Sequence, residues 1–311
     1  MSRKPPKKLQ AVVTVERVNG FREWLKGRVL GQPEVIPAFD RHLGRSELGL
    51  TDPTLVKGAF LFVGPTGVGK TELVTSFAEY FHGKDSLLKL NMSEFKDVDQ
   101  VREIRERLVK GKAAGKKVFL WDELEKAHAE AMDLLLQILD AGAEISGMDG
   151  EPVSFTDSYV FGTSNLGASE AMRSRTRNYT AYCNTVVEYV QRHLRPELLG
   201  RIRRGIGSIL VFQRLGEPEQ RAVAELHVRK VLARLEVHGH SLTLEPGAFE
   251  HIMRNGFSEQ YGARNILGVI CDRLEGAVSD ALRNGKGTSG SVSVRPDGLG
   301  LEIAAPAAIG A

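Results

Sequence analysis

The stretch GPTGVGKT, residues 64–71, decides the fold class of this chain. The apolar run before it, residues 59–63, predicts a buried strand, and the apolar residues after it recur at helical spacing. A strand, a glycine-rich turn and a helix are the context that a phosphate-binding loop (P-loop) requires. Gly64, Gly67 and Gly69 would let backbone N–H groups face phosphate oxygens, and the start of the following helix favours the same anion. The stretch therefore predicts nucleotide binding, with an ordinary glycine-rich turn as the alternative.

Side chains in and before this stretch have their own expected roles. Lys70 can reach the β- and γ-phosphates of ATP, and the Thr71 hydroxyl is a ligand for Mg²⁺. Residues 16–48 predict two helices, and the break between them holds Val29 and Leu30, which could contact a flat adenine ring or simply anchor the loop. We assign nucleotide binding to these two residues and to the whole loop, namely Gly64, Pro65, Thr66, Gly67, Val68, Gly69, Lys70 and Thr71. ATP and Mg²⁺ are the expected cofactors.

The composition describes a globular chain that is long enough for two domains. It has 311 residues, 42% of them hydrophobic, and a net charge of +3, which is too weak by itself to indicate nucleic-acid binding. Cys183 and Cys271 are its two cysteines and neither has the spacing of a metal site, so we expect no disulfide framework. The apolar run nearest the N-terminus, residues 11–13, is too short for a signal peptide or a membrane span. We therefore expect a cytoplasmic protein with no membrane partner.

Apolar runs of strand length recur along the first two thirds of the chain. They lie at residues 87–91, 117–123, 159–163 and 208–212, and helical spacing recurs between them, at 97–112 and 131–139. Strands that are almost wholly apolar and alternate with helices predict a parallel sheet covered on both faces. Together with the strand at 59–63, they predict an α/β fold, a P-loop domain with a five-stranded parallel sheet.

A change of pattern after residue 212 predicts a second domain. Residues 217–283 have helical spacing with breaks at Gly239, Pro246 and Gly256, and residues 291–303 predict a terminal hairpin around a PDG turn. The expected organisation is a basic flexible tail over residues 1–15, a large P-loop domain over 16–213, and a small helical lid domain with the hairpin over 214–311.

Three polar residues follow apolar runs downstream of the P-loop. Asp122 and Glu123 close the run at 117–123, where Asp122 would hold Mg²⁺ through its water shell and Glu123 would polarise the attacking water. Two adjacent carboxylates could also be an ordinary strand terminus. Asn165 follows the run at 159–163 and could orient the same water or touch the γ-phosphate, although taken alone it is more often a turn residue. We take Glu123 and Asn165 as candidate catalytic residues, and Thr71 and Asp122 as candidate metal ligands.

Motifs along most of the chain resemble one protein family. They are VLGQ at 29–32, LGLTDP at 48–53, GAFLFVGPTGVGKTEL at 58–73, NMSEF at 91–95, DELEKAH at 122–128, LLQILDAG at 135–142, TSNLG at 163–167, LRPELLGRI at 194–202 and YGARNI at 261–266. Over residues 28–284 the chain resembles the second ATPase module of Clp-type AAA+ unfoldases such as ClpB and ClpA. The resemblance implies an arginine finger at Arg201, which reaches the γ-phosphate bound by the neighbouring subunit, and a sensor arginine at Arg264 on the lid. Because such a finger shares the site between subunits, the resemblance also implies a homo-oligomer, expected to be a hexameric ring.

The sequence departs from the family pattern in several places. The span from Phe95 to Asp122 is shorter than in the family and lacks the aromatic Gly-Tyr-Val-Gly pore loop, so we expect no threading of a polypeptide through a pore. Because only residues 1–63 precede the P-loop, we expect no second ATPase module, amino-terminal substrate domain or coiled-coil insertion. Arg203 and Arg204 replace acidic residues after the finger stretch. No tripeptide of the Ile-Gly-Phe type follows Asn165, so a ClpP-type peptidase is not an expected partner.

The expected function is ATP binding and Mg²⁺-dependent hydrolysis in an oligomeric ring, coupled to remodelling of a protein complex. Arg264 would sense the γ-phosphate from the lid while Lys70 holds it from below, so rotation of the lid would be the output. A nucleic-acid motor or loader is the first alternative, with phosphate contacts from arginines at 173–177 and 192–204 that could equally face ATP or a neighbouring subunit. A nucleotide-dependent assembly scaffold is the second alternative.

Overall fold

The structure, a computed structural model, describes residues 7–147, 150–169, 178–204, 207–257, 263–285, 287–298 and 300–303. For residues 7–14, 98 and 264 it describes the backbone alone. The chain divides into two compact units. The large unit comprises Met1–Pro65 and Gly69–Gln213, and the small unit comprises Thr66–Val68 and Arg214–Ala311.

The core of the large unit is a five-stranded sheet in the order β2-β3-β6-β1-β7. Its strands are β1 (Gly58–Val63), β2 (Leu87–Asn91), β3 (Val118–Asp122), β6 (Tyr159–Ser164) and β7 (Gly207–Val211). Every neighbouring pair is parallel, so the predicted five-stranded parallel sheet is confirmed. The carboxyl ends of β1, β3 and β6 consequently lie side by side at one end of the sheet.

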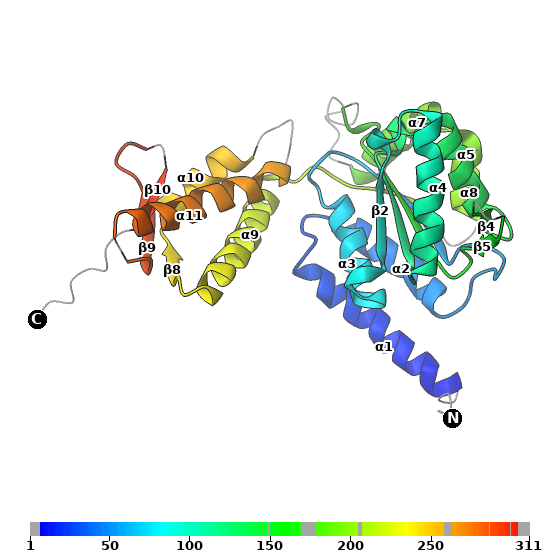
Figure 1. Ribbon diagram of the computed structural model, residues 1–311, viewed down its shortest axis with the longest axis horizontal. Coiled ribbons are helices and arrows are strands. Elements are labelled where there is room, and N and C mark those ends of the chain that lie inside the picture. Colours follow the sequence, from blue (N-terminus) through cyan, green and yellow to red (C-terminus); the bar gives the residue numbers. More distant parts are fainter. Residues whose placement is uncertain are drawn as a thin grey trace, which may run out of the picture. The chain divides into compact units, whose positions relative to one another are not determined.

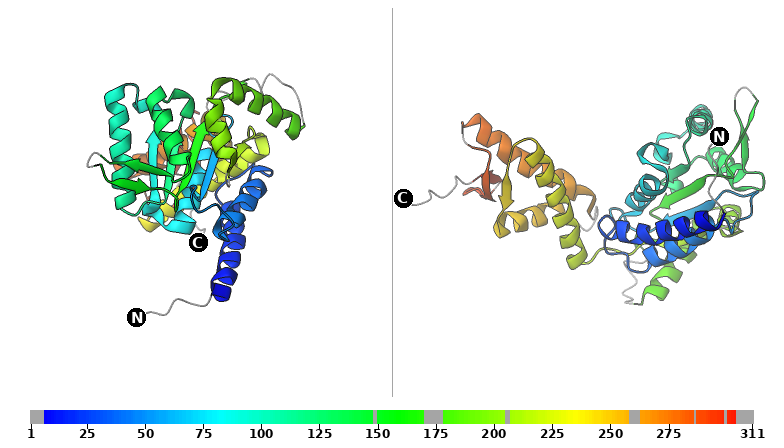
Figure 2. Two further views of the ribbon diagram at one scale, coloured as in Figure 1. Left: turned by 90° about the vertical axis from the view of Figure 1, so that its right-hand side faces the viewer. Right: turned by 90° about the horizontal axis from the view of Figure 1, so that it is seen from below.

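Helices cover both faces of this sheet (Figures 1 and 2). One layer holds α1 (Lys7–Lys26), α2 (Val35–Glu47) and α3 (Lys70–His82), and the other holds α4 (Val98–Ala113), α5 (Ala129–Leu139), α7 (Tyr179–His193) and α8 (Pro196–Arg204). Successive side chains of β1 point to opposite faces of the sheet and so pack against the two helical layers in turn. The rings of Phe60 and Phe62 pack on Phe39 of α2, whereas Leu61 and Val63 belong to the apolar core shared with the second layer.

The N-terminal helix corrects one expectation. The helix α1 begins at Lys7, so the flexible tail expected over residues 1–15 is wrong from Lys7 onward. The helix is anchored farther along, where Phe21 is fully buried and its ring centroid lies 5.2 Å from that of Phe81 in α3. Arg17 also donates a hydrogen bond to the carbonyl of Phe81. A basic segment that would be disordered alone can extend a helix that tertiary packing has already nucleated.

The small unit combines three long helices with a sheet. Its helices are α9 (Glu217–Val237), α10 (Pro246–Gly256) and α11 (Ile266–Arg283). The strands β9 (Gly290–Val294) and β10 (Leu301–Ile303) pair antiparallel, which confirms the terminal hairpin. The strand β8 (Leu242–Leu244) pairs in parallel with β9. It lies between the expected breaks at Gly239 and Pro246, where the sequence predicted no strand. Buried side chains from all three helices and from β9 and β10 form one apolar core.

Three short strands are among the elements that the sequence did not predict. In the large unit, β4 (Glu144–Ser146) and β5 (Pro152–Ser154) form an antiparallel hairpin. These two strands and β8 are each three residues long. Alternation over so few positions cannot be distinguished from an irregular loop.

The structure also bears on the cysteines and on membrane contact. Cys183 and Cys271 are both free and half-buried. Among the helices in the described ranges, none is long and apolar enough to cross a bilayer.

The last turn of α3 places a titratable ring in the aromatic layer. The ring centroid of His82 lies 5.7 Å from that of Phe77 and 5.8 Å from that of Tyr159. Its Nε2 atom is buried and has no hydrogen-bond partner among the described residues. Burial lowers the pKa of His82 to about 4, against the opposing charge of Glu47 and with a further lowering by nearby Lys and Arg side chains. The neutral ring is therefore the form that the fold accommodates.

This lowered pKa predicts a loss of stability in mild acid. The unfolded chain binds a proton as the pH falls through the ordinary value of 6.5, whereas the folded chain resists it down to about 4. The contribution of His82 to the free energy of unfolding is therefore complete above pH 6.5. About 2 kcal/mol of that free energy is lost at pH 5. Denaturant unfolding at pH 7.5 and pH 5.0 should show a smaller acid loss for His82→Gln than for the wild type. Equal losses in the two proteins would contradict this explanation.

Candidate functional site

The P-loop joins β1 to α3 and has the backbone of an anion-binding turn. Gly64, Gly67 and Gly69 have φ angles of 140°, 71° and 100°, in the region that favours glycine. A Cβ on Gly64 would lie 2.5 Å from the carbonyl oxygen of Phe212, so glycine is also needed there for space. Positive φ angles in such a turn allow successive N–H groups to face one anion.

Lys70, the first residue of α3, is only 8% exposed. Its Nζ atom donates hydrogen bonds to the carbonyl oxygens of Gly64 and Pro65, each at 2.6 Å, and to Oδ1 of Asn165 at 3.0 Å. The fold thus brings together two candidate residues, Lys70 and Asn165, that are 95 positions apart. A buried ammonium group is costly unless acceptors or an anion compensate it. The loop therefore presents a cation suited to a phosphate group.

Asp122 ends β3 and is bound by two neighbouring side chains. Its Oδ2 atom lies 2.6 Å from Nζ of Lys89, and its Oδ1 atom accepts a hydrogen bond from the hydroxyl of Thr163 in β6. Burial alone would raise the pKa of Asp122, but the hydrogen bonds from Lys89 and Thr163 and the charges of Lys89 and Lys70 lower it below its ordinary value. The carboxylate is therefore ionised at neutral pH, as a metal ligand must be.

The oxygen groups at this end of the sheet fit Mg²⁺. Thr71 in the first turn of α3 offers a hydroxyl, and Asp122 offers an ionised carboxylate. Within the described ranges, no cluster of three or more His, Cys, Asp or Glu residues could hold a metal ion. Mg²⁺ in nucleotide sites commonly keeps several waters and binds one or two protein groups plus the substrate phosphates. These two residues therefore suit an ion that is bound together with a nucleotide.

Glu123 begins a sharp turn after β3. Its φ of 61° and ψ of 52° are left-handed, a conformation that costs about 1–3 kcal/mol for a residue with a Cβ and that is frequent at functional sites. The turn continues into η3 (Leu124–Lys126), and Gly162 of β6 makes room for it, since a Cβ there would lie 2.2 Å from Cδ1 of Leu124. The carboxylate of Glu123 is 17% exposed and lies 2.7 Å from Nζ of Lys126. The turn thus holds a partly exposed carboxylate beside Asp122.

Three partners at this site were not predicted from the sequence, namely Lys89, Glu125 and Thr163. Oε1 of Glu125 accepts hydrogen bonds from the backbone N–H of Asn165 at 3.1 Å and from its Nδ2 atom at 3.3 Å. The hydroxyl of Thr163 bonds to Asp122 and also accepts from the backbone N–H of Glu123 at 3.1 Å. The signals available in the sequence were the third carboxylate of DELE and the threonine of TSN. Neither signal identifies a partner about 40 positions away.

Arg201 lies in the last turn of α8 and is paired with Asp140, the residue that closes α5. Its Nε atom is 2.7 Å from Oδ1 of Asp140, and its Nη2 atom is 2.8 Å from Oδ2. Arg204 donates a hydrogen bond to the carbonyl of Leu139 at the same helix end. In the described part of the chain the hydrogen bonds of Arg201 go to Asp140, so the fold does not bring Arg201 to the P-loop of its own subunit.

The remaining candidates are placed only in part. Val29 is buried and packs beside the P-loop, since its Cγ1 atom lies 3.3 Å from where a Cβ on Gly69 would be, and Leu30 is half-buried. Arg264 lies in η4 (Ala263–Asn265) of the small unit, and its side chain is outside the described part of the structure. The arginines at 173–177 also fall outside the described residues.

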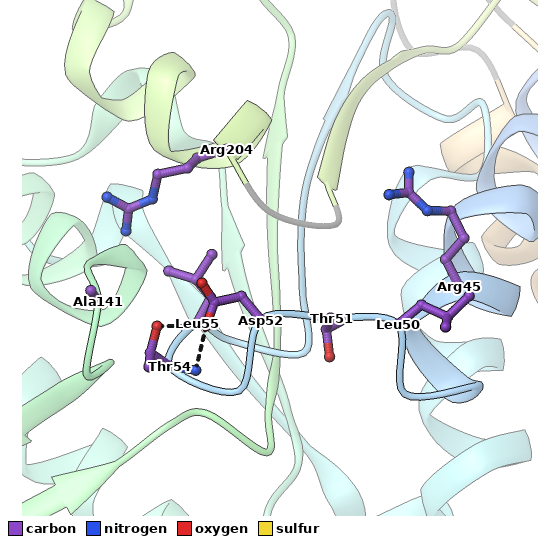
Figure 3. Close-up of a pocket in the computed structure, with 8 residues that line it drawn as sticks. All are labelled: Arg45, Leu50, Thr51, Asp52, Thr54, Leu55, Ala141 and Arg204. Atoms are coloured by element: carbon purple, nitrogen blue, oxygen red, sulfur yellow. Dashed lines mark hydrogen bonds between the residues drawn. The ribbon is translucent and has the colours of Figure 1, made fainter.

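A separate pocket of about 370 Å³ opens elsewhere on the large unit. Its lining residues are Arg45, Leu50, Thr51, Asp52, Thr54, Leu55, Ala141 and Arg204. Figure 3 shows Arg45 and Arg204 at opposite ends, with the carboxylate of Asp52 bonded to the backbone N–H and hydroxyl of Thr54. The two guanidinium groups lie apart and do not face one shared position where an anion could bind both. The described lining includes no P-loop residue. This pocket is therefore distinct from the candidate nucleotide site.

Known proteins resemble the chain over nearly all of its length. Residues 56–204 match the family model of an AAA domain (Cdc48 subfamily), and residues 215–294 match the model of the C-terminal, D2-small domain of ClpB protein. The chaperone protein ClpB of Vibrio vulnificus (strain CMCP6) is 34% identical over 297 residues, which cover 91% of this chain and 33% of that protein. The ATP-dependent Clp protease ATP-binding subunit ClpA homolog of Porphyra purpurea is 32% identical over 305 residues, which cover 90% of this chain and 36% of that protein.

The chain spans about a third of the length of these relatives. A third relative, the subunit ClpC of Staphylococcus saprophyticus, is 29% identical over 307 residues, which cover 91% of this chain and 37% of that protein. The first family model covers the P-loop and the strands of the large unit up to α8, and the second covers the helices of the small unit. The matches to both units show that this chain belongs to the Clp-type AAA+ family of ATPases.

Proposed function

We propose that this chain binds ATP with Mg²⁺, hydrolyses it in an oligomeric ring, and couples hydrolysis to the remodelling of a protein complex. The observation that supports this best is the contact of Lys70 with Asn165, next to Asp122 and Glu123 at the carboxyl end of a parallel sheet. Ligands of open α/β sheets bind beyond the carboxyl ends of the strands. The four side chains thus lie where a nucleotide is expected.

Each residue of the site has one task in this proposal. The backbone N–H groups of the P-loop and Lys70 bind the phosphates, while Thr71 and Asp122 hold Mg²⁺, which neutralises phosphate charge. Glu123 acts as the base that polarises the attacking water. Because Lys70 already contacts Asn165, a γ-phosphate bound by the lysine would lie next to that amide. The site then has a cation, a base and a polar group around one phosphate.

The position of Arg201 supports the oligomeric part of the proposal. Its guanidinium group is held by Asp140 on the surface formed by α5 and α8. An arginine finger supplied by a second subunit stabilises the charge of a transferred phosphoryl group. A hexameric ring is the arrangement that follows from the family resemblance. We propose that Arg201 of one subunit completes the site of the next.

The start of α4 supports remodelling without threading. Phe95 is buried, and the guanidinium group of Arg107 lies 5.4 Å from the centre of its ring. Asp97 and Gln100 form a capping box that begins the helix just after Phe95. The described segment 92–100 therefore offers no exposed aromatic side chain to grip a polypeptide. We propose that the client complex is engaged by surface contacts.

The alternatives receive less support. In the described range 192–204, Arg195 is paired with Asp133 and Arg201 with Asp140, so their charges are compensated within the chain and are less available to nucleic-acid phosphates. An assembly scaffold would bind nucleotide without needing turnover. We propose a cytoplasmic protein that acts without a ClpP-type peptidase.

Lys70→Ala tests the binding part of the proposal. Each charge-assisted hydrogen bond contributes about 1.5–3 kcal/mol, so removal of the ammonium group should weaken ATP binding roughly 100-fold. Isothermal titration calorimetry with ATP and Mg²⁺ measures the affinity. Lys84→Ala is the matched control, because that side chain is 83% exposed and should not affect binding. An ATP affinity of Lys70→Ala within threefold of the wild type would contradict the assignment of Lys70 to phosphate binding.

Glu123→Gln tests the chemical step. The substitution keeps the size of the side chain and removes the base, so kcat should fall by about 100- to 10,000-fold while ATP stays bound. Trapped ATP should also stabilise the oligomer, which light scattering after size exclusion detects. Glu130→Gln, on the exposed first turn of α5, is the control. Unchanged phosphate release by Glu123→Gln would rule out its role as the base.

Arg201→Ala tests whether sites are shared between subunits. Hydrolysis should be lost, by about 1,000-fold or more, with nucleotide affinity within a few-fold of the wild type. A mixture with Glu123→Gln should regain turnover, because the latter supplies an intact arginine to a neighbour with an intact base. Arg192→Ala, which removes a side chain that is 74% exposed, is the control. If no mixture of the two variants hydrolyses ATP faster than either variant alone, the hypothesis of a shared site is wrong.

A further inference from the structure

We infer that Glu125 is a positioning residue for hydrolysis, because it fixes which side of the Asn165 amide faces the phosphates. The inference rests on the proposed function, since it assigns a task to a residue behind that site. Glu125 lies in η3, two positions after the candidate base Glu123. Among the described residues its side chain forms hydrogen bonds with Asn165 and with no residue of the P-loop, so it acts through another residue.

The hydrogen bonds on both sides of Asn165 require the same orientation of the amide. Oε1 of Glu125 lies 3.3 Å from the side-chain nitrogen of Asn165, and a carboxylate oxygen accepts hydrogen bonds. On the other side, Nζ of Lys70 lies 3.0 Å from Oδ1 of Asn165, and an ammonium group can only donate. A flipped amide would place oxygen against the carboxylate and N–H against the ammonium, and both contacts would be repulsive.

The carboxylate of Glu125 is not explained by stability alone. Its Oε2 atom is buried and has no hydrogen-bond partner among the described residues. A buried polar atom without a partner is unfavourable, and an apolar side chain at this position would avoid that burial. Oε1 also accepts from the backbone N–H of Asn165 at 3.1 Å, so one oxygen fixes both the backbone and the side chain of that residue.

This orientation decides between the two roles that the sequence left open for Asn165. With Oδ1 on the side of Lys70, the amide presents an acceptor to the phosphate site. An acceptor can take a hydrogen bond from the attacking water, whereas it cannot donate to a γ-phosphate oxygen. Asn165 therefore orients the water, and Glu125 keeps it in the competent orientation.

A double-mutant cycle tests this role. In Glu125→Ala, kcat should fall about 10- to 100-fold, the loss typical of a residue that supports a functional group, with the KM for ATP within threefold of the wild type. Glu125→Gln keeps an acceptor at Oε1 and should retain kcat within a few-fold. In the Asn165→Ala background, removal of Glu125 should cause no further loss. Glu130→Ala is the matched control on the neighbouring helix.

If Glu125→Ala does not fold, a double variant that exchanges the acid and the amide between positions 125 and 165 tests the same role. Asn165→Asp alone would set two carboxylates against each other and should lose turnover. Combining it with Glu125→Gln supplies a side-chain N–H donor to the aspartate and should recover part of that loss, as phosphate release will measure. A purely structural role of Glu125 would lower the melting temperature without such recovery.

The outcomes separate this inference from the proposed function. Loss of turnover in Glu123→Gln and Asn165→Ala but not in Glu125→Ala overturns the inference alone. The inference is also overturned if the losses of kcat in Glu125→Ala and Asn165→Ala are additive, or if Glu125→Gln does not restore turnover to Asn165→Asp. Full turnover in all three single variants overturns the proposed site as well.

Discussion

A single buried ammonium group links the phosphate loop to the neighbouring strand. Nζ of Lys70 donates hydrogen bonds to the carbonyl of Gly64 after β1 and to the amide of Asn165 after β6. Since the side chain is almost fully buried, acceptors or an anion must compensate its charge. The same charge helps to lower the pKa of Asp122, and Glu125 holds Asn165 from behind. The polar groups at this end of the sheet therefore depend on one another.

The strand order makes these contacts possible. β6 lies between β1 and β3 although it comes after both in the chain. Its hydroxyl at Thr163 consequently reaches Asp122 and the backbone of Glu123, and its glycine at 162 leaves the space that Leu124 fills. Parallel strands in this order bring their carboxyl ends together, so residues from three separate segments form one polar cluster.

The second helical layer connects this cluster to the surface that carries Arg201. α5 begins shortly after the turn at Glu123 and is closed by Asp140, which holds the guanidinium group of Arg201. Arg195 pairs with Asp133 partway along the same helix. Apolar side chains of α5 and α8 also share one core. The turn that holds the proposed base is thus joined through α5 to the arginine proposed for the next site.

The sequence by itself determined the large-unit fold and its P-loop. Almost wholly apolar strands alternating with amphipathic helices admit few other arrangements, and GPTGVGKT with glycines at positive φ has a recognisable local chemistry. It also supplied the candidates Lys70, Asp122, Glu123 and Asn165. Only the tertiary structure decided that α1 starts at Lys7, that β8 joins the terminal hairpin, and that Glu125, Thr163 and Lys89 are the partners of those candidates. The physical reason is that short strands and side-chain pairs draw their stability from residues distant in the chain, which local patterns do not identify.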